Sequence, residues 1–167
     1  PDLIVTRVWT VPENPIPGGS YKVWCTVKNQ GAATANPSGI DQWINCRFYI
    51  GNTDLGKEEQ WCTTIQANGT YDFCSGEKTA PSAATYTFKA VVDDQGDVGE
   101  SYENNNEGTA SIVIKYPTYT VLATAGTGGS VTPSSRTVTH GDRTTFTVSP
   151  STHYVRNSVS GDASGGS

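Results

Sequence analysis

The segment from Asp93 to Asn106 is rich in oxygen-bearing side chains. Its carboxylates and amides lie on Asp93, Asp94, Asp97, Glu100, Glu103 and residues 104–106. Hard cations such as calcium take about six to eight oxygen ligands from groups of this kind, held by a flexible loop. The spacing is not that of an EF-hand. The pattern predicts a structural calcium site at Asp93, Asp97, Glu100 and Glu103, with Asp2 approaching from the first strand. The alternative is that these residues form turns and a solvated loop.

A second group of candidate binding residues alternates along one predicted strand. If Ile44, Cys46 and Phe48 point inward, the residues between them point outward, because side chains alternate across a strand. The outward set is Trp43, Asn45, Arg47 and Tyr49. A hairpin turn over residues 51–56 would place Cys46 opposite Cys62, and Arg47 opposite Trp61.

This register predicts an exposed aromatic surface on Trp43, Tyr49 and Trp61. Flat aromatic rings stack on the apolar faces of sugars, and polar neighbours bond the hydroxyl groups. We expect Asn45, Arg47 and Lys89 to select among sugars, the two cations favouring an acidic polysaccharide. The alternative is that the tryptophans pack under loops or against another domain.

The elements that position both groups are short strands with frequent turns. Apolar residues alternate with polar ones before each turn signal, and no amphipathic helix occurs. The predicted strands cover residues 3–8, 21–27, 44–50, 61–65, 71–73, 86–92 and 111–115. This pattern indicates an antiparallel β-sandwich.

The four cysteines all lie in the first half of the chain, and none forms a Cys-x-x-Cys pair. An even number without metal-ligand spacing favours two disulfides in an oxidising, extracellular compartment. The hairpin register predicts Cys46–Cys62, which leaves Cys25–Cys74. The alternatives are 25–46 with 62–74, or 25–62 with 46–74.

Three sequence motifs in order resemble the CARDB family, a cell-adhesion-related domain of bacterial surface and secreted proteins. They are the opening PDLIV (residues 1–5), the strand end TVKNQG (residues 26–31) and the acidic segment VVDDQGDVGESYENNN (residues 91–106). The resemblance covers residues 1–115. It implies an immunoglobulin-like β-sandwich on the outside of the cell.

The pattern changes after Pro117. Residues 118 to about 160 resemble a bacterial surface repeat related to the internalin B repeats, through YTVLATAGTGGSVTP (residues 119–133) and TFTVSP (residues 145–150). The resemblance stops early, so residues 116–167 are predicted to form a partial β-repeat domain. An incomplete sheet leaves an unpaired edge, through which the chain could associate with a second copy.

Composition and motifs narrow the function further. The net charge of −5 and a pI near 4.9 disfavour nucleic acid, which requires a basic face. No apolar run is long enough to cross a membrane. His140 and His153 are far apart, and the common catalytic motifs do not occur. We therefore expect a non-catalytic extracellular module that binds polysaccharide. The alternative is a structural spacer or a subunit of a surface fibre.

Overall fold

The structure, a computed structural model, describes residues 1–38, 43–58 and 61–155. The chain divides into two compact units, Pro1–Tyr116 and Pro117–Ser167. All regular elements in the described residues are strands, and none of those residues lies in a helix that could cross a membrane.

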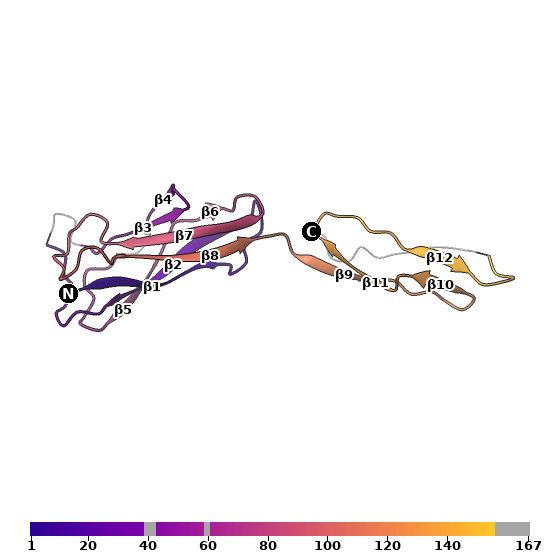
Figure 1. Cartoon of the computed structure of the whole chain (residues 1–167), viewed down its shortest axis with the longest axis horizontal. Helices are drawn as coiled ribbons and strands as arrows, with labels where there is room; N and C mark the ends of the chain where they lie inside the picture. The colour runs from indigo at the N-terminus through magenta and orange to yellow at the C-terminus, as the bar shows by residue number, and fades with distance from the viewer. Residues whose placement is uncertain (39–42, 59–60, 156–167) are drawn as a thin grey trace. The chain divides into compact units, whose positions relative to one another are not determined.

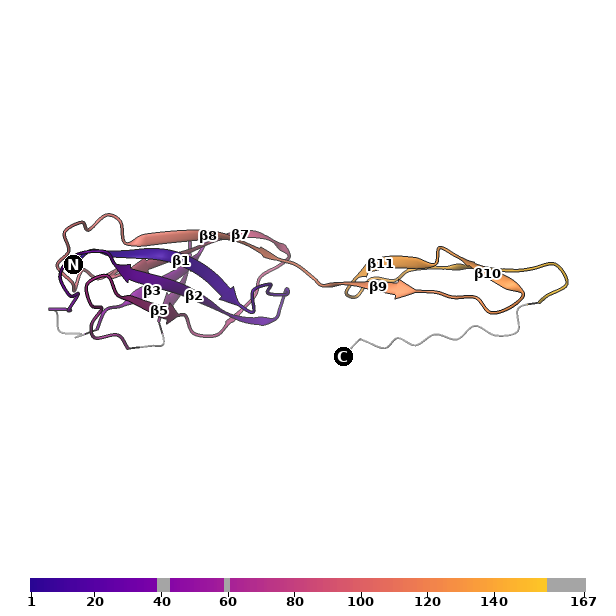
Figure 2. The ribbon, with the colours of Figure 1, turned by 90° about the horizontal axis from the view of Figure 1, so that it is seen from below.

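The first unit consists of two antiparallel sheets that face each other (Figures 1 and 2). One sheet contains β1 (Leu3–Val11), β2 (Ser20–Asn29), β5 (Thr70–Cys74) and the short β6 (Lys78–Thr79). The other contains β4 (Thr53–Lys57), β3 (Cys46–Ile50), β7 (Ala84–Val92) and β8 (Glu107–Ile114), in that order. This arrangement confirms the predicted immunoglobulin-like sandwich.

The core lies between the inner faces of the two sheets. On β2 every second residue from Tyr21 to Val27 is buried, as strand alternation requires. Phe48 and Phe88 of one sheet and Phe73 of the other are fully buried, and the ring of Tyr21 meets that of Phe88 edge to face. The apolar side of each strand is therefore covered by the opposite sheet.

The predicted register of the hairpin after β3 is wrong. Ile50 pairs with Thr53 and Arg47 pairs with Lys57, so the turn contains only Gly51 and Asn52. Gly51 has a φ of 55°, which suits glycine in a tight hairpin turn. The strand that was not predicted, β4, occupies the position assigned to residues 61–65.

Cys62 therefore faces Ile44 instead of Cys46, in an isolated bridge. Arg47 does not lie opposite Trp61. The physical reason is the short turn: it returns the chain after two residues, and a register shift between Phe48 and Tyr49 accommodates one extra residue on β4. Residues 61–65 form no strand.

The three motifs noted in the sequence meet at one end of the sandwich. The buried side chain of Asn29 accepts N–H groups from Asp2 and Gly31, each at 3.1 Å, and donates to the carbonyls of Ala33 at 2.8 Å and Ile65 at 3.0 Å. One amide thus bonds four backbone groups, and a buried group that lost its partner would be costly. It ties the N-terminus to the strand end.

Gly31 follows this amide and lies directly against the N-terminal backbone. A Cβ atom at Gly31 would lie 2.7 Å from the backbone nitrogen of Asp2 and 2.7 Å from the carbonyl carbon of Pro1. We expect Gly31→Ala to lower the free energy of unfolding by about 2 kcal/mol, because backbone atoms on both sides must move apart. Urea denaturation measures the change.

Gly99→Ala is the control for Gly31→Ala, since no heavy atom lies within 4 Å of the Cβ position there. Equal stability of the two variants would contradict the predicted clash.

Residues 117–155, the described part of the second unit, contain two ribbons of two strands. β9 (Thr118–Leu122) pairs with β11 (Ser135–Thr139), and β10 (Gly129–Thr132) pairs with β12 (Thr147–Pro150). No residue from 117 to 155 is buried, and Tyr119, Leu122 and Tyr154 are among its exposed large apolar residues. Residues 156–167 of the predicted partial repeat lie outside the described part.

Candidate functional site

The acidic segment forms the connection between β7 and β8. Asp93 begins it with a φ of 52°, a left-handed conformation that aspartate tolerates better than most residues. Its carboxylate accepts backbone N–H groups from Asp97 at 2.9 Å and Val98 at 3.1 Å. Asp93 therefore folds the loop around its own side chain, as an aspartate in a turn commonly does.

Three of the predicted metal ligands converge. Oxygen atoms of Asp93, Glu100 and Glu103 all lie within 4.8 Å of one another, with Asp93 buried and Glu103 exposed. Burial is the largest cause of the raised pKa of Asp93, and the negative charge of Glu103 adds a smaller increase. Burial likewise raises the pKa of Glu100, and the charges of Asp93 and Glu103 add to it. Bringing negative oxygens together in this way is costly unless a proton or a cation neutralises them.

Asp2 and Asp97 are not members of this three-carboxylate group. Asp2 is buried and accepts the side-chain amides of Gln30 at 2.9 Å and Asn105 at 2.8 Å. Asp97 accepts the side-chain amide of Asn45 at 3.3 Å. Both carboxylates thus hold the loop against its neighbours.

The N-terminus adds a direct connection to the group. The backbone nitrogen of Leu3 donates to the carboxylate of Glu100, and Ser101 donates to the carbonyl of Pro1 at 3.0 Å. Figure 2 shows the N-terminus at the end of the unit where this loop lies.

Two amide oxygens next to the carboxylates fit a hard cation. Asn106 donates its side-chain N–H to Glu100 at 2.6 Å, yet its own buried Oδ1 accepts no hydrogen bond within the described structure. The Oδ1 atom of Asn105 is in the same situation. Carboxylate and amide oxygens are the ligands that calcium prefers, so the donor chemistry is suitable.

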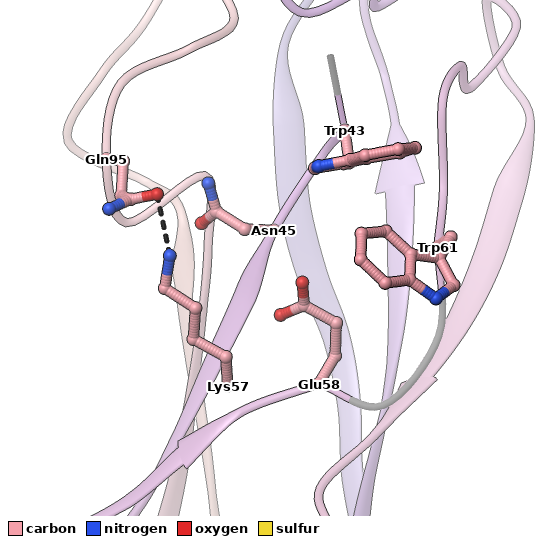
Figure 3. A pocket seen from close by; sticks show the side chains of 6 residues that line it. All are labelled: Trp43, Asn45, Lys57, Glu58, Trp61 and Gln95. Atoms are coloured by element: carbon pink, nitrogen blue, oxygen red, sulfur yellow. Dashed lines mark hydrogen bonds between the residues drawn. The ribbon is translucent and has the colours of Figure 1, made fainter. Parts of the chain in front are cut away.

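A cavity of about 310 Å³ lies beside the sheet formed by β3, β4, β7 and β8, and Figure 3 shows its walls. The rings of Trp43 and Trp61 meet edge to face with centroids 4.3 Å apart. Trp61 is 69% exposed and Trp43 is 37% exposed. The other lining residues are polar: Asn45, Lys57, Glu58 and Gln95.

The polar wall is held by hydrogen bonds. Lys57 donates to the side chain of Gln95 at 2.6 Å (Figure 3). Glu58 accepts the backbone N–H of Cys46 at 2.6 Å. Burial raises the pKa of Glu58, which lies near the charge of Asp94. The cavity thus combines exposed aromatic surface with groups able to bond hydroxyls.

Asn45 joins this cavity to the acidic loop. Its side chain is buried; Oδ1 accepts the backbone N–H of Asp94 at 2.9 Å and Nδ2 donates to Asp97. Both polar ends are thus bonded to the loop that carries Gln95.

The remaining predicted contact residues lie outside this cavity. Arg47 pairs with Asp94 at 2.7 Å and Asp54 at 2.6 Å, and the bond to Asp94 contributes most to the raised pKa of its guanidinium. The ammonium of Lys89 lies 4.8 Å from the ring centroid of Tyr49, and it is 3.5 Å from Glu107. Arg47 and Lys89 therefore already have anionic partners on the protein.

Sequence reasoning missed Lys57, Glu58 and Gln95 as wall residues. The polar run over residues 57–60 gave no sign that β4 would end beside Trp61. The alternation of β4 itself is weak, because Thr53 and Asp54 are both exposed. A shorter turn, indicated by Gly51-Asn52, could have revealed the strand.

The four cysteine side chains, all within the described residues, are buried, and none is joined in a disulfide in this structure. The sulfur atoms of Cys25, on β2, and Cys46, on β3, are 3.4 Å apart. Cys62 donates to the carbonyl of Thr64 at 3.6 Å, and Cys74 pairs across the strands with Trp24. The predicted pairing of Cys46 with Cys62 thus loses the cross-strand position on which it rested.

Fold and site together describe an immunoglobulin-like β-sandwich with an acidic loop at one end and an aromatic cavity beside it. The CARDB family model matches residues 1–110. The chain belongs to the CARDB family, as the three sequence motifs predicted.

Solved structures support the fold. A CARDB domain from Pyrococcus furiosus, determined in complex with di-metal ions, is 23% identical with a TM-score of 0.52, over 68% of this chain and 88% of that one. A domain of a candidate cell-surface protein from Methanosarcina acetivorans is 21% identical with a TM-score of 0.54, over 68% of this chain and 91% of that one. No curated protein matches the chain. The resemblance of residues 118 to about 160 to a surface repeat stays a prediction.

Proposed function

We propose that this protein is a non-catalytic module of the cell exterior that binds polysaccharide in the cavity between Trp43 and Trp61. The observation that carries the proposal is the pair of exposed indole rings beside Lys57 and Glu58. A sugar ring can place its apolar face on an indole while its hydroxyls bond charged and amide groups. The family membership and the relative from Methanosarcina support a position at the cell surface.

The residues divide into two roles under this proposal. Trp61, which is the more exposed, provides the stacking surface, and Trp43 fixes its orientation from the side. Asn45 holds the loop that carries Gln95, so its role would be to position Gln95 for contact with the sugar. Because Arg47 and Lys89 are already paired with carboxylates, selection for an acidic polysaccharide rests on Lys57.

Trp61→Ala should weaken polysaccharide binding about five- to thirtyfold, because one stacked ring contributes roughly 1–2 kcal/mol. Affinity electrophoresis in gels that contain neutral or acidic polysaccharides measures the retardation. The melting temperature should change little, since the ring is largely exposed.

Trp9→Ala is the matched control: it removes the same ring from the other sheet, where Trp9 stacks on Trp24. Equal retardation of wild type and Trp61→Ala, or no retardation in any gel, would overturn the cavity as a polysaccharide site.

Calcium, in this proposal, orders the loop and takes no part in chemistry. Asp93, Glu100 and Glu103 would hold the ion, with the amide oxygens of Asn105 and Asn106 nearby. The support is the donor chemistry on this chain and the di-metal complex of the Pyrococcus relative. The cation would neutralise carboxylates that otherwise repel one another.

A second candidate function, as a spacer or fibre subunit, has one observation in its favour. The strands described in the second unit occur in two-stranded ribbons and expose Tyr119, Leu122 and Val148. Such ribbons present unpaired edges that can accept a strand from a second copy. Sedimentation velocity of the full chain distinguishes this function, since it requires assembly that increases with protein concentration.

A further inference from the structure

Two of the four thiols lie against each other across the core. Cys25 belongs to β2 of one sheet and Cys46 to β3 of the facing sheet, and both side chains are fully buried. Their sulfur atoms are 3.4 Å apart and each thiol can donate to the other. The strands point these side chains inward through ordinary alternation, so the contact follows from the packing of the sheets.

We propose that Cys25 and Cys46 form a disulfide that links the two sheets of the sandwich. The bond length is about 2 Å, so the sulfurs need to approach by roughly 1.4 Å from their separation of 3.4 Å. The bond would close a loop over residues 26–45, which includes Trp43 and Asn45.

The alternative pairings fit the structure less well. Cys62 bridges to Ile44 at the edge of β3, and Cys74 faces Trp24, whose neighbour Cys25 faces Phe73. Cys25 and Cys74 lie on the neighbouring strands β2 and β5 but are not directly opposite each other, since their positions differ by one residue in register. The thiol in contact with Cys46 is that of Cys25.

The bond must form before the core closes. Both sulfurs are inaccessible to solvent in the folded unit. Burial raises the pKa of Cys46 well above its ordinary value, and the hydrogen bond with the Cys25 thiol is the second-largest cause. Thiolate is the reactive form, so the folded reduced protein should react slowly. Oxidation is expected during folding, while the two strands are still exposed.

The oxidant is a small-molecule disulfide such as glutathione disulfide. One cysteine thiolate attacks it, forms a mixed disulfide and releases one glutathione thiolate; the second cysteine then displaces the other. The Cys25–Cys46 bond forms as the glutathione S–S bond breaks. Two electrons pass to glutathione, and the two thiol protons end on the released glutathione thiols.

The test is to refold the full chain with reduced and oxidised glutathione, block free thiols in denaturant, digest without reduction and identify linked peptides by mass spectrometry. We expect a peptide pair joined through Cys25 and Cys46. A link from Cys46 to Cys62, a link from Cys25 to Cys74, or alkylation of both Cys25 and Cys46 would overturn the proposal. This measurement uses the unmodified chain, so it does not depend on any variant folding.

Thermal unfolding provides a second measurement. The oxidised chain should melt about 10 °C above the same chain refolded in reductant, because a loop of this length is constrained in the unfolded state. The difference should persist in Cys62→Ala/Cys74→Ala and disappear in Cys25→Ala/Cys46→Ala. Persistence in the latter variant would contradict the assigned pair.

Discussion

Asn29→Ala should lower the free energy of unfolding of the first unit by about 4 kcal/mol. The amide of Asn29 satisfies the backbone groups of Asp2, Gly31, Ala33 and Ile65, and its residue is fully buried. Alanine removes the partner of the N–H groups of Asp2 and Gly31 and of the carbonyl of Ala33, and each unsatisfied buried group costs about 1–3 kcal/mol. The carbonyl of Ile65 still accepts the backbone N–H of Ala35 at 2.9 Å. Some of this cost is recovered if water enters the space.

Urea denaturation followed by tryptophan fluorescence measures the loss. Asn29→Asp separates the two halves of the network, because aspartate keeps the acceptor for Asp2 and Gly31 but cannot donate to Ala33 and Ile65. Asn14→Ala, at an exposed position, is the control and should change stability by less than about 0.5 kcal/mol. A loss below about 1 kcal/mol in Asn29→Ala would contradict the central role of this amide.

Calcium should raise the melting temperature of the first unit by about 10 °C at a concentration about a hundred times its dissociation constant. Under the proposal the ion would bind the folded loop, where Asp93, Glu100 and Glu103 converge, and not the unfolded chain, where they are apart. Differential scanning fluorimetry with calcium, and again with EDTA, measures the shift.

The shift should depend on pH in a defined direction. The pKa values of Asp93 and Glu100 are raised in the folded state, mainly by burial. Without calcium, these two groups favour folding below their unfolded pKa values, and this contribution is lost as pH rises through the raised folded values. Calcium requires the charged carboxylates, so its stabilising effect should be full at neutral pH and should diminish as pH falls through those same raised values.

Matched variants locate the calcium effect. Glu103→Gln removes one converging carboxylate from an exposed position, so the fold should survive while the calcium-dependent shift falls. Glu107→Gln makes the same charge change outside the group, at a residue paired with Lys89, and should retain the full shift. An equal calcium-dependent shift of the melting temperature in both variants, or no shift in the wild type, would contradict the proposed calcium site.

The polysaccharide and disulfide experiments are independent of the Asn29 and calcium experiments. Loss of the calcium shift alone would leave the Trp43–Trp61 cavity as a binding site. Asn45 connects the two regions through its bonds to Asp94 and Asp97. Gel retardation in the presence of EDTA therefore shows whether loop order affects the cavity.

Local patterns in the chain were sufficient to determine the class of fold and the location of its motifs. Strand alternation correctly placed Cys25, Ile44, Cys46 and Phe48 in the core, because the two-residue period of a strand is a local property. The order of the three motifs indicated the CARDB family. The acidic residues of the loop were recognisable because their density is a feature of the sequence alone.

Only the tertiary structure decided which of these residues meet. A two-residue turn at Gly51-Asn52 sets the register of β3 and β4. As a result Trp61 does not lie opposite Arg47, and Lys57 and Glu58 line the cavity beside Trp61. Register depends on turn geometry, and a small error in it reassigns every cross-strand partner. In the same way, the thiol contact of Cys25 with Cys46 and the convergence of Asp93, Glu100 and Glu103 arise from sheet packing and loop closure, which local sequence patterns do not encode.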